Sequence, residues 1–459
     1  MSKSAAADGK SAQFKPNAAQ IVAILRQHRL FLDGVPGGQR AVLHFYDLSG
    51  QDLSNCNLSE SDLTGVILSQ SRLLGASFQR ANLFCADLRR ADLSHADFTR
   101  ADMRGVCLRG AALSDAILVG ADFRTATLAK SEGKGDLQFV NFEETASQLT
   151  AIVAQRANMS GAKLSDSFVL QADLTDANLN NADLSGVDLR NSVLIGSSLS
   201  GANFSGAKLG GATLAGADLT GAKLSGADFA DADMRGAVLD LEAMDCEELK
   251  ASIRLREIRL EGPELTALLD KHKSWLDSLS KSGARADLSG VDMSGQCLTG
   301  ADLTLVQMAR CALRNSNLAG STFTHADMAF ADLRGANFSH SDLRGIDMQR
   351  ATLNGANLSS VNLNPLEHVG LQQKLTPSNL CRARLVGANM RDARMHKVNL
   401  AGADLRDADL SNANLSEADL TSAKLTGATL QGADFTGAIL ANVTGLDAAT
   451  LASLQGASA

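Results

Sequence analysis

Residues 81–105 read ANLFC-ADLRR-ADLSH-ADFTR-ADMRG, which is one five-residue pattern repeated without a gap. Each copy begins with a small residue, continues with Asp or Asn, and has an apolar residue at its centre. The central apolar residue recurs at every fifth position over four stretches of the chain: Leu43 to Leu128, Met159 to Leu239, Leu288 to Leu363 and Leu380 to Leu440. The chain is therefore a tandem array, and its fold must satisfy a period of five.

A period of five fits neither an α-helix nor a straight strand. In an α-helix each residue advances by about 100°, so every fifth side chain moves around the cylinder. In a straight strand side chains alternate, so residues five apart point to opposite faces. The central residues can share one interior only if the chain bends once in every repeat. The Ser, Thr and Gly residues that often follow each centre suit such a corner, because they tolerate unusual dihedral angles or bond locally to the backbone.

Individual copies carry a family resemblance. Ala86 to Arg90 (ADLRR) and Ala217 to Gly221 (ADLTG) resemble the A(D/N)LXX repeats of the pentapeptide-repeat family. The resemblance implies an all-β solenoid, a right-handed quadrilateral β-helix in which four repeats form one 20-residue coil. We expect four arrays of such coils, at residues 41–130, 157–240, 284–364 and 380–445, with short α-helical caps and insertions.

The repeat predicts which side chains form the core. Apolar centres that are 20 residues apart should stack, which places Phe78 on Phe98 and aligns Met308, Met328 and Met348. Representative core residues are expected at Leu48, Leu88, Phe98, Leu174, Leu219, Met328, Leu333, Leu405 and Leu420. Each coil would contact only its neighbours, so the ends of the array need caps.

Two similar leader segments indicate an internal duplication. Residues 17–33 have the apolar spacing of a helix, and 267–277 repeat it before the third array. We interpret both as caps that cover a first coil, with Phe31 and Trp275 among the covering side chains. The remaining segments are expected as follows: 1–16 disordered, 17–40 helical cap, 131–156 flexible interruption with a helix at 143–156, 241–283 helical linker and cap with two helices separated at Gly262-Pro263, 365–379 interruption, and 446–459 C-terminal cap helix.

The sequence offers little for catalysis. Its seven cysteines form no CxxC pair, which argues against a zinc site or a disulfide framework. No phosphate-binding loop or nucleophile motif occurs in a strand–turn–helix setting. The Asp or Asn before each centre, as at Asp62, Asn82, Asp102 and Asp122, occurs in nearly every repeat and is better explained by turn geometry. We therefore predict no catalytic, cofactor-binding or metal-binding residue, no cofactor and no enzymatic activity.

Two histidines occupy equivalent places on the leader segments, His28 and His272. A metal site would need further ligands nearby, so packing within the cap or a bond at the helix end is the favoured interpretation. The sequence contains no apolar run of the length that crosses a membrane and no apolar signal core at its start. These observations predict a cytoplasmic protein without a membrane span.

Three functions are compatible with such a solenoid. The favoured one is a scaffold that binds other proteins, whose identity the sequence does not give. The alternative comes from family members that mimic DNA and bind type II topoisomerases such as DNA gyrase; it requires a sustained acidic surface. The net charge is −8, and only residues 157–240 are clearly acidic, with 10 Asp and 5 Lys or Arg. A secreted effector or membrane-associated structural protein is the second alternative. No direct nucleic-acid binding is expected, and an uncovered solenoid end would allow two copies to pair.

Overall fold

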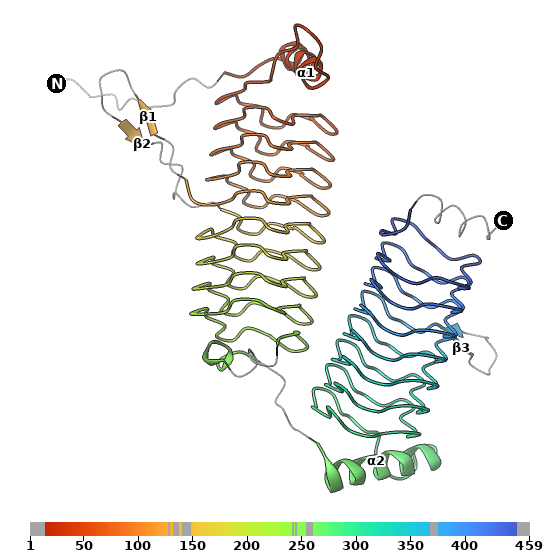
Figure 1. Ribbon diagram of the computed structural model, residues 1–459. Coiled ribbons are helices and arrows are strands. Elements are labelled where there is room, and N and C mark those ends of the chain that lie inside the picture. Colours follow the sequence, from red (N-terminus) through yellow and green to blue (C-terminus); the bar gives the residue numbers. More distant parts are fainter. Residues whose placement is uncertain are drawn as a thin grey trace. The chain divides into compact units, whose positions relative to one another are not determined.

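The computed structural model describes residues 14–126, 129–131, 137–139, 148–240, 243, 246–253, 260–367 and 375–447. The chain divides into two compact units, Met1–Ile253 (unit 1) and Arg254–Ala459 (unit 2). Within each unit the backbone rises as a stack of coils (Figure 1).

Successive coils are joined by parallel backbone bridges between residues 20 positions apart, such as Asp62 with Asn82. The Leu63 amide donates to the Asn82 carbonyl at 2.7 Å, and the Asn82 amide donates to the Ser61 carbonyl at 2.9 Å. The ladders are built from single bridges, because each repeat turns a corner before a strand can lengthen. At many corners the second residue after the centre has a left-handed backbone conformation, as Arg90 does with φ 56°.

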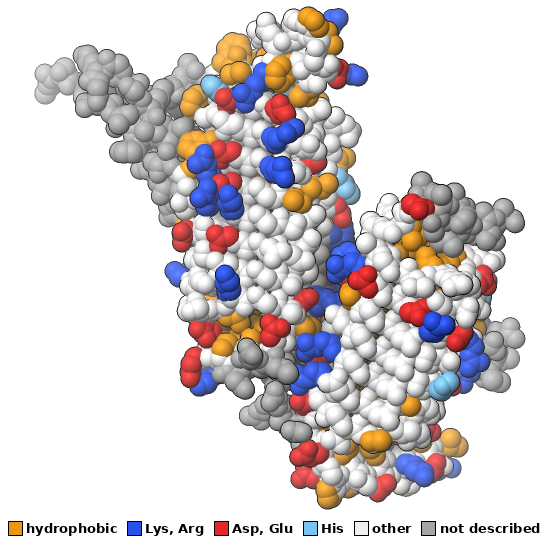
Figure 2. Space-filling model, viewed as in Figure 1, with side chains coloured by type: hydrophobic (Ala, Val, Ile, Leu, Met, Phe, Trp, Pro, Cys, Tyr) orange, Lys and Arg blue, Asp and Glu red, His pale blue; other side chains and the backbone are white. Residues whose placement is uncertain are grey.

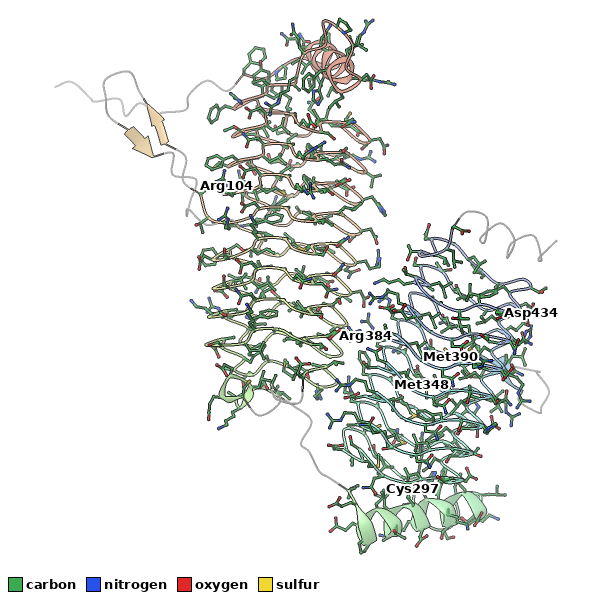
Figure 3. All side chains as sticks on the ribbon, in the orientation of Figure 1. Arg104, Cys297, Met348, Arg384, Met390 and Asp434 are labelled. Atoms are coloured by element: carbon green, nitrogen blue, oxygen red, sulfur yellow. The ribbon has the colours of Figure 1, made fainter. Side chains whose placement is uncertain are left out.

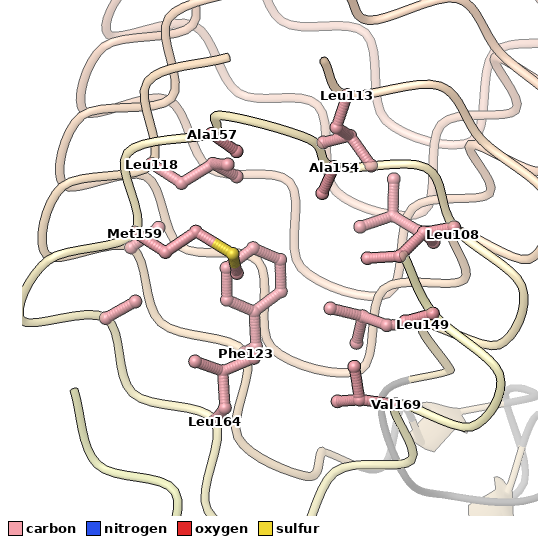
Figure 4. Close-up of a cluster of buried hydrophobic side chains, with 14 of the residues drawn as sticks. Leu108, Leu113, Leu118, Phe123, Leu149, Ala154, Ala157, Met159, Leu164 and Val169 are labelled. Carbon is pink, nitrogen blue, oxygen red and sulfur yellow. The ribbon is translucent and has the colours of Figure 1, made fainter. Parts of the chain in front are cut away.

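The interior contains the apolar centres and the small residues two positions before them. All nine representative core residues are at most 2% exposed. The Phe78 and Phe98 rings stack with centroids 4.9 Å apart and planes within 3°. Figure 4 shows centres of two consecutive coils, including Leu108 and Leu149, packed together inside unit 1. A five-residue period thus yields one dry interior per unit.

Each unit begins with a helix across its first coil. Helix α1 (Ala18–Leu32) starts with a capping box between Asn17 and Gln20. Its partly buried residues Ile21, Ile24 and Leu25 pack against the core of unit 1. Helix α2 (Gly262–Asp277) buries Leu265 in the same way.

The cap residues differ from the expectation in one respect. Phe31 remains 36% exposed and Trp275 is half-buried, whereas His28 and His272 are fully buried. Each aromatic ring stacks on the histidine three residues earlier. Neither ring is among the helix side chains that pack against the core of its unit.

The linker between the units also differs from the expectation. Gly262 and Pro263 lie in the first turn of α2, where Pro is well tolerated, and not between two helices of the described part; residues 254–259 lie outside it. Before it, the short 3₁₀ helix η2 (Glu247–Leu249) buries Leu249 against the core of unit 1. Ile253 still pairs with Asp233.

The interruption in unit 1 is shorter than expected. Its described part contains an antiparallel pair, β1 (Ala129–Ser131) with β2 (Leu137–Phe139). Residues 148–156 are not helical: Gln148 bridges to Cys107, and Val153 bridges to Ala112. The expected helix at 143–156 is therefore wrong from 148 onward, and 143–147 lie outside the described residues. Arrays one and two therefore form one continuous stack of coils.

Two repeats were missed, centred on Leu149 and Ala154, and the second has its large and small inward residues exchanged. Ile152 and Ala154 are 1% and 0% exposed, so the small residue stands at the centre and the large one two positions before it. The total volume that fills the interior stays similar. An Ala at the centre hides the repeat from a search for apolar residues at every fifth position.

In unit 2 the interruption is a short antiparallel pair, β3 (Leu366–Glu367) with β4 (Leu375–Thr376). Asp347 bridges to Asn379 across it, so arrays three and four are also continuous. The described residues thus form two continuous stacks of coils, one in each unit, where four arrays were expected. Among the described residues, no helix is long and apolar enough to cross a membrane.

The chain ends are described only in part. The expected disorder at 1–16 is wrong for its last residues, because the Asp47 amide donates to the Phe14 carbonyl at 3.0 Å. Phe14 also contacts the Tyr46 ring at 4.9 Å. Residues 1–13 lie outside the described part, as does most of the expected C-terminal helix, residues 448–459.

Candidate interaction surfaces

The Asp or Asn before each centre is a turn residue. Its side-chain oxygen accepts the backbone N–H two residues later, as Asp173 does from Thr175 at 3.0 Å and Asp92 does from Ser94 at 3.2 Å. Asn side chains also bond along the ladder, where Asn82 Nδ2 donates to Asp62 Oδ1 at 3.1 Å. The stacked carboxylates of the sequence are therefore engaged in holding corners and rungs.

Many of these carboxylates also bind an arginine from the same repeat. Arg190 donates to Asp188 through Nε at 2.8 Å and Nη2 at 2.6 Å, a two-pronged contact. The same Asp–Arg clamp occurs at Asp87–Arg89, Asp102–Arg104, Asp122–Arg124, Asp233–Arg235, Asp332–Arg334, Asp342–Arg344 and Asp404–Arg406. Sequence analysis missed the clamp, although Asp and Arg two positions apart around a centre are a readable signal.

The clamp changes the electrostatics of the carboxylate. The Asp188 side chain is only 4% exposed. Burial raises its pKa, but the hydrogen bonds from Arg190 and the charges of Arg190 and Lys208 outweigh burial and hold the pKa below its usual value. Asp188, Lys208 and Asp228 follow one another on one ladder, so charge alternates even in the most acidic part of the chain. In Figure 2, acidic and basic side chains are interspersed on the visible face.

Asp347 in unit 2 lacks such a clamp. Burial and the neighbouring charge of Asp327 raise its pKa, opposed by hydrogen bonds from the Gln349 amide and Asn379. The Gln349 amide and Asn379 Nδ2 both lie 3.0 Å from Asp347 Oδ1. Folding thus raises the pKa of Asp347, whereas it lowers the pKa of Asp188.

One corner of unit 2 combines arginine with an aromatic ring. The guanidinium carbons of Arg310 and Arg350 lie 5.4 and 6.0 Å from the Phe330 ring centroid. We call these three residues the Arg–Phe–Arg corner. Arg104 makes a similar contact with Phe84 in unit 1, at 5.4 Å, and Figure 3 labels it on the outside of the coils. Neither set was predicted from the sequence, although their members are 20 residues apart and this spacing is readable.

Unit 1 exposes apolar side chains where other repeats have Asp or Asn. Ile117 and Val153 are 39% and 42% exposed; they stand on neighbouring coils but on two different ladders, Ile117 beside Asn158 and Val153 beside Ala112. We call this pair the apolar step. Single exposed aliphatic residues are common on protein surfaces, so this pair gains meaning only from contact with a partner.

The described residues hold no group of three or more His, Cys, Asp or Glu side chains placed to bind a metal ion. All seven cysteines lie in the described part of the chain, and none of them forms a disulfide bond. Burial raises the pKa of Cys85 to about 11. Cys297 is exposed, and its hydrogen bonds with Thr299 lower its pKa. A low-pKa thiol alone supports no assignment.

A family model described as pentapeptide repeats (8 copies) matches more than half of the chain, at residues 41–80, 71–110, 107–132, 155–191, 172–211, 197–236, 301–339, 331–364, 374–412 and 403–442. The chain belongs to the pentapeptide-repeat family. No curated protein sequence matches this pentapeptide-repeat protein.

Solved structures include several similar repeat proteins. HetL, involved in heterocyst differentiation regulation in the cyanobacterium Nostoc sp. strain PCC 7120, has 19% identity over 93% of this chain and 98% of its own, with a TM-score of 0.18. QnrB1, a plasmid-mediated fluoroquinolone resistance protein, has 17% identity over 63% and 98%, with a TM-score of 0.18. AT2G44920 from the Arabidopsis thaliana thylakoid lumen has 30% identity over 26% and 66%, with a TM-score of 0.17. These likenesses assign no function to this chain.

Proposed function

We propose that this pentapeptide-repeat protein is a non-enzymatic, cytoplasmic scaffold that binds other proteins through the outer side chains of its coils. The observation that carries the proposal is the engagement of its carboxylates. They accept turn amides, and many are clamped by arginine, so they are poorly placed for acid–base chemistry. The right-handed quadrilateral form of the coils belongs to the same proposal.

The Asp–Arg clamps also weigh against DNA mimicry. A protein surface that imitates duplex DNA must present a continuous run of negative charge. Here Arg190 neutralises Asp188, and Lys208 stands on the next rung. A scaffold does not need such a run, because partner binding depends on a few apolar, aromatic or arginine anchors.

The apolar step and the Arg–Phe–Arg corner are the two surfaces best suited to anchor a partner. Aromatic and arginine side chains are enriched at the energetic centres of protein interfaces. Ile117 and Val153 supply exposed aliphatic area on one unit, and Phe330 with its arginines supplies an amphipathic site on the other.

The test is photo-crosslinking in the native host with the full chain. A photoreactive residue is placed at Ile117 or Phe330, with matched controls at Ile439, an outward residue that is 52% exposed, and at Phe84. We expect specific protein adducts at Ile117 or Phe330 and none at the controls. Equal labelling at all four positions contradicts partner binding at these surfaces.

A second assay separates the scaffold from DNA mimicry. The purified full chain is added to a gyrase supercoiling reaction at increasing salt. The scaffold proposal expects no inhibition at micromolar protein. Salt-sensitive inhibition that is abolished by Asp228→Lys would support mimicry and overturn the proposal.

A further inference from the structure

Both cap helices hold a buried histidine in the same contact. The Ala41 amide, at the start of the first coil of unit 1, donates to His28 Nδ1 at 3.1 Å. In unit 2 the Ala286 amide donates to His272 Nδ1, also at 3.1 Å. Both histidines are 0% exposed. The repetition in two separate units indicates a contact with a role of its own.

This contact requires a neutral imidazole. A ring nitrogen that accepts an N–H cannot carry a proton itself, so the proton must be on Nε2. In unit 2, His272 Nε2 lies 3.1 Å from the Thr304 carbonyl and can donate to it. Among the described residues His28 Nε2 makes no hydrogen bond, although the nearby Ser59 carbonyl raises the pKa of this ring. A second proton, on Nδ1, would replace the amide hydrogen bond with repulsion between two donors.

The surroundings of both rings disfavour the charged form. His28 stacks on Phe31 and His272 on Trp275, each with centroids 5.9 Å apart. Burial is the largest influence and lowers the pKa of both; the Ser59 and Thr304 carbonyls oppose it. The charged neighbours divide evenly: Arg40 and Arg285 lower the pKa, whereas Glu60 and Asp302 raise it.

We propose that His28 and His272 are proton-operated latches that keep the caps closed at neutral pH and release them in acid. Apart from the latch, α1 contacts its unit mainly through partly buried apolar residues such as Ile21, Ile24 and Leu25. Release would uncover the leucines of the first coil, Leu43, Leu48, Leu53 and Leu58, which line a cavity under the helix. The latch therefore controls whether an apolar solenoid end is available, a regulation beyond partner binding by the coil faces.

The direction of the pH effect follows from the two states of the cap. A histidine in an open cap has the ordinary pKa of about 6.5, and in the closed cap its pKa is lower. The closed state is thus favoured in full above about pH 6.5 and loses this advantage as the pH falls below that value. One coupled proton raises the opening constant by up to about tenfold per pH unit, until the pH reaches the closed-state pKa.

The experiment uses the full chain and two readouts. Trp275 is the single tryptophan, so its fluorescence reports on α2 alone. The variant Phe31→Trp with Trp275→Phe moves the reporter to α1. Hydrogen-exchange mass spectrometry between pH 7.5 and 5.0 follows peptides around Ala41 and Ala286, corrected for intrinsic exchange and referenced to the mid-solenoid peptide 83–103.

We expect corrected exchange at both caps to rise several-fold in acid, while peptide 83–103 stays unchanged. His272→Gln retains an acceptor that does not titrate, so it should abolish the acid response of α2 and leave that of α1; His28→Gln should do the reverse. The exposed His340 provides the matched control, and His340→Gln should change neither cap. A wild-type chain whose caps stay equally protected at both pH values overturns the proposal, as does an unchanged acid response of each cap in its own Gln variant.

Discussion

Units 1 and 2 share one frame and fill it differently. Both begin with a helix that covers the first coil and a histidine that binds the first amide. Unit 1 then stacks Phe78 on Phe98, whereas unit 2 buries Met328 and its neighbours along one column. Two kinds of core side chain fit the same coil, because each central residue needs only to be apolar and to match the coils beside it. The spacing of the apolar centres determines the backbone of the coil, and the packing of their side chains determines its stability.

Two carboxylates at the same position of the repeat, one in each unit, are held differently. Asp188 in unit 1 is held by arginine, whereas Asp347 in unit 2 is partly buried without an arginine clamp. The same position in the repeat is therefore stabilising at Asp188 and costly at Asp347, which is a contrast between two sites, since unit 2 also has Asp–Arg clamps.

The largest effect is expected for a charge placed in the interior. Leu88 is 0% exposed, so Leu88→Asp would bury an unpaired carboxylate and cost about 3–5 kcal/mol or more. Leu333→Asp is the matched change in unit 2, where Leu333 is also 0% exposed. In calorimetry each variant should lower the transition of its own unit. If both variants destabilise the whole chain equally, the two units do not unfold separately.

The core contrast predicts a smaller but clear difference. Phe78→Ala should cost about 3–5 kcal/mol, and a double-mutant cycle with Phe98→Ala should give a coupling of about 0.5–1.5 kcal/mol from the stacked rings. Met328→Leu replaces a flexible side chain with one of similar volume and should cost less than about 1.5 kcal/mol. Denaturant melts measure both. A Met328→Leu cost as large as that of Phe78→Ala would contradict the idea that the frame accepts either filling.

The carboxylate contrast predicts opposite signs. Asp188→Asn breaks the clamp of a nearly buried carboxylate and should destabilise unit 1 by about 1–3 kcal/mol at pH 7. Asp347→Asn removes a charge that burial and Asp327 disfavour, so it should be neutral or stabilise unit 2 by up to about 1 kcal/mol.

The pH dependence of these two variants gives an independent check. The pKa of Asp188 is lowered by folding, so its contribution is present above the unfolded value of 3.8 and is lost as the pH falls through the folded pKa. The pKa of Asp347 is raised by folding, so acid should stabilise unit 2 at this site. Melting curves of wild type and variants between pH 7 and 3 measure both trends, and equal pH dependence of the two sites would contradict the contrast.

The smallest effect is expected at an open surface pair. Arg72 and Asp52 lie 3.6 Å apart, with side chains 64% and 58% exposed. Arg72→Ala should leave the unfolding midpoint unchanged within the error of measurement, because exposed ion pairs gain little and are screened by salt. A clear loss of stability in this variant would mean that clamped and open ion pairs do not differ in strength.

The sequence was sufficient for the coil and for most of its interior. Phe78, Met328 and Leu405 could be assigned inward from spacing alone, since no other arrangement buries every fifth side chain. Ile152 and Ala154 could not, because their combined volume fills the interior while neither position shows the expected pattern. The predicted start of the second array was therefore misplaced, because an Ala stands at the centre of the repeat that precedes it.

The surfaces were harder to predict because they depend on side-chain direction. Arg190 could have pointed to solvent; only the structure places it across Asp188. His28 and His272 were recognised as equivalent cap residues, but their acceptor contacts link each helix to an amide beyond a loop. Distances across a loop of that kind are not contained in a periodic pattern.

The uninterrupted ladder across each hairpin has a consequence for how this chain is compared with others. Cys107 and Gln148 are 41 positions apart, yet they pair as Asp87 and Cys107 do. Position along the polymer is thus a poor coordinate for this molecule, and rung number is the natural one. Two relatives aligned residue by residue would appear to lose similarity after the inserted loop, whereas alignment by rung would recover matching columns on both sides of it.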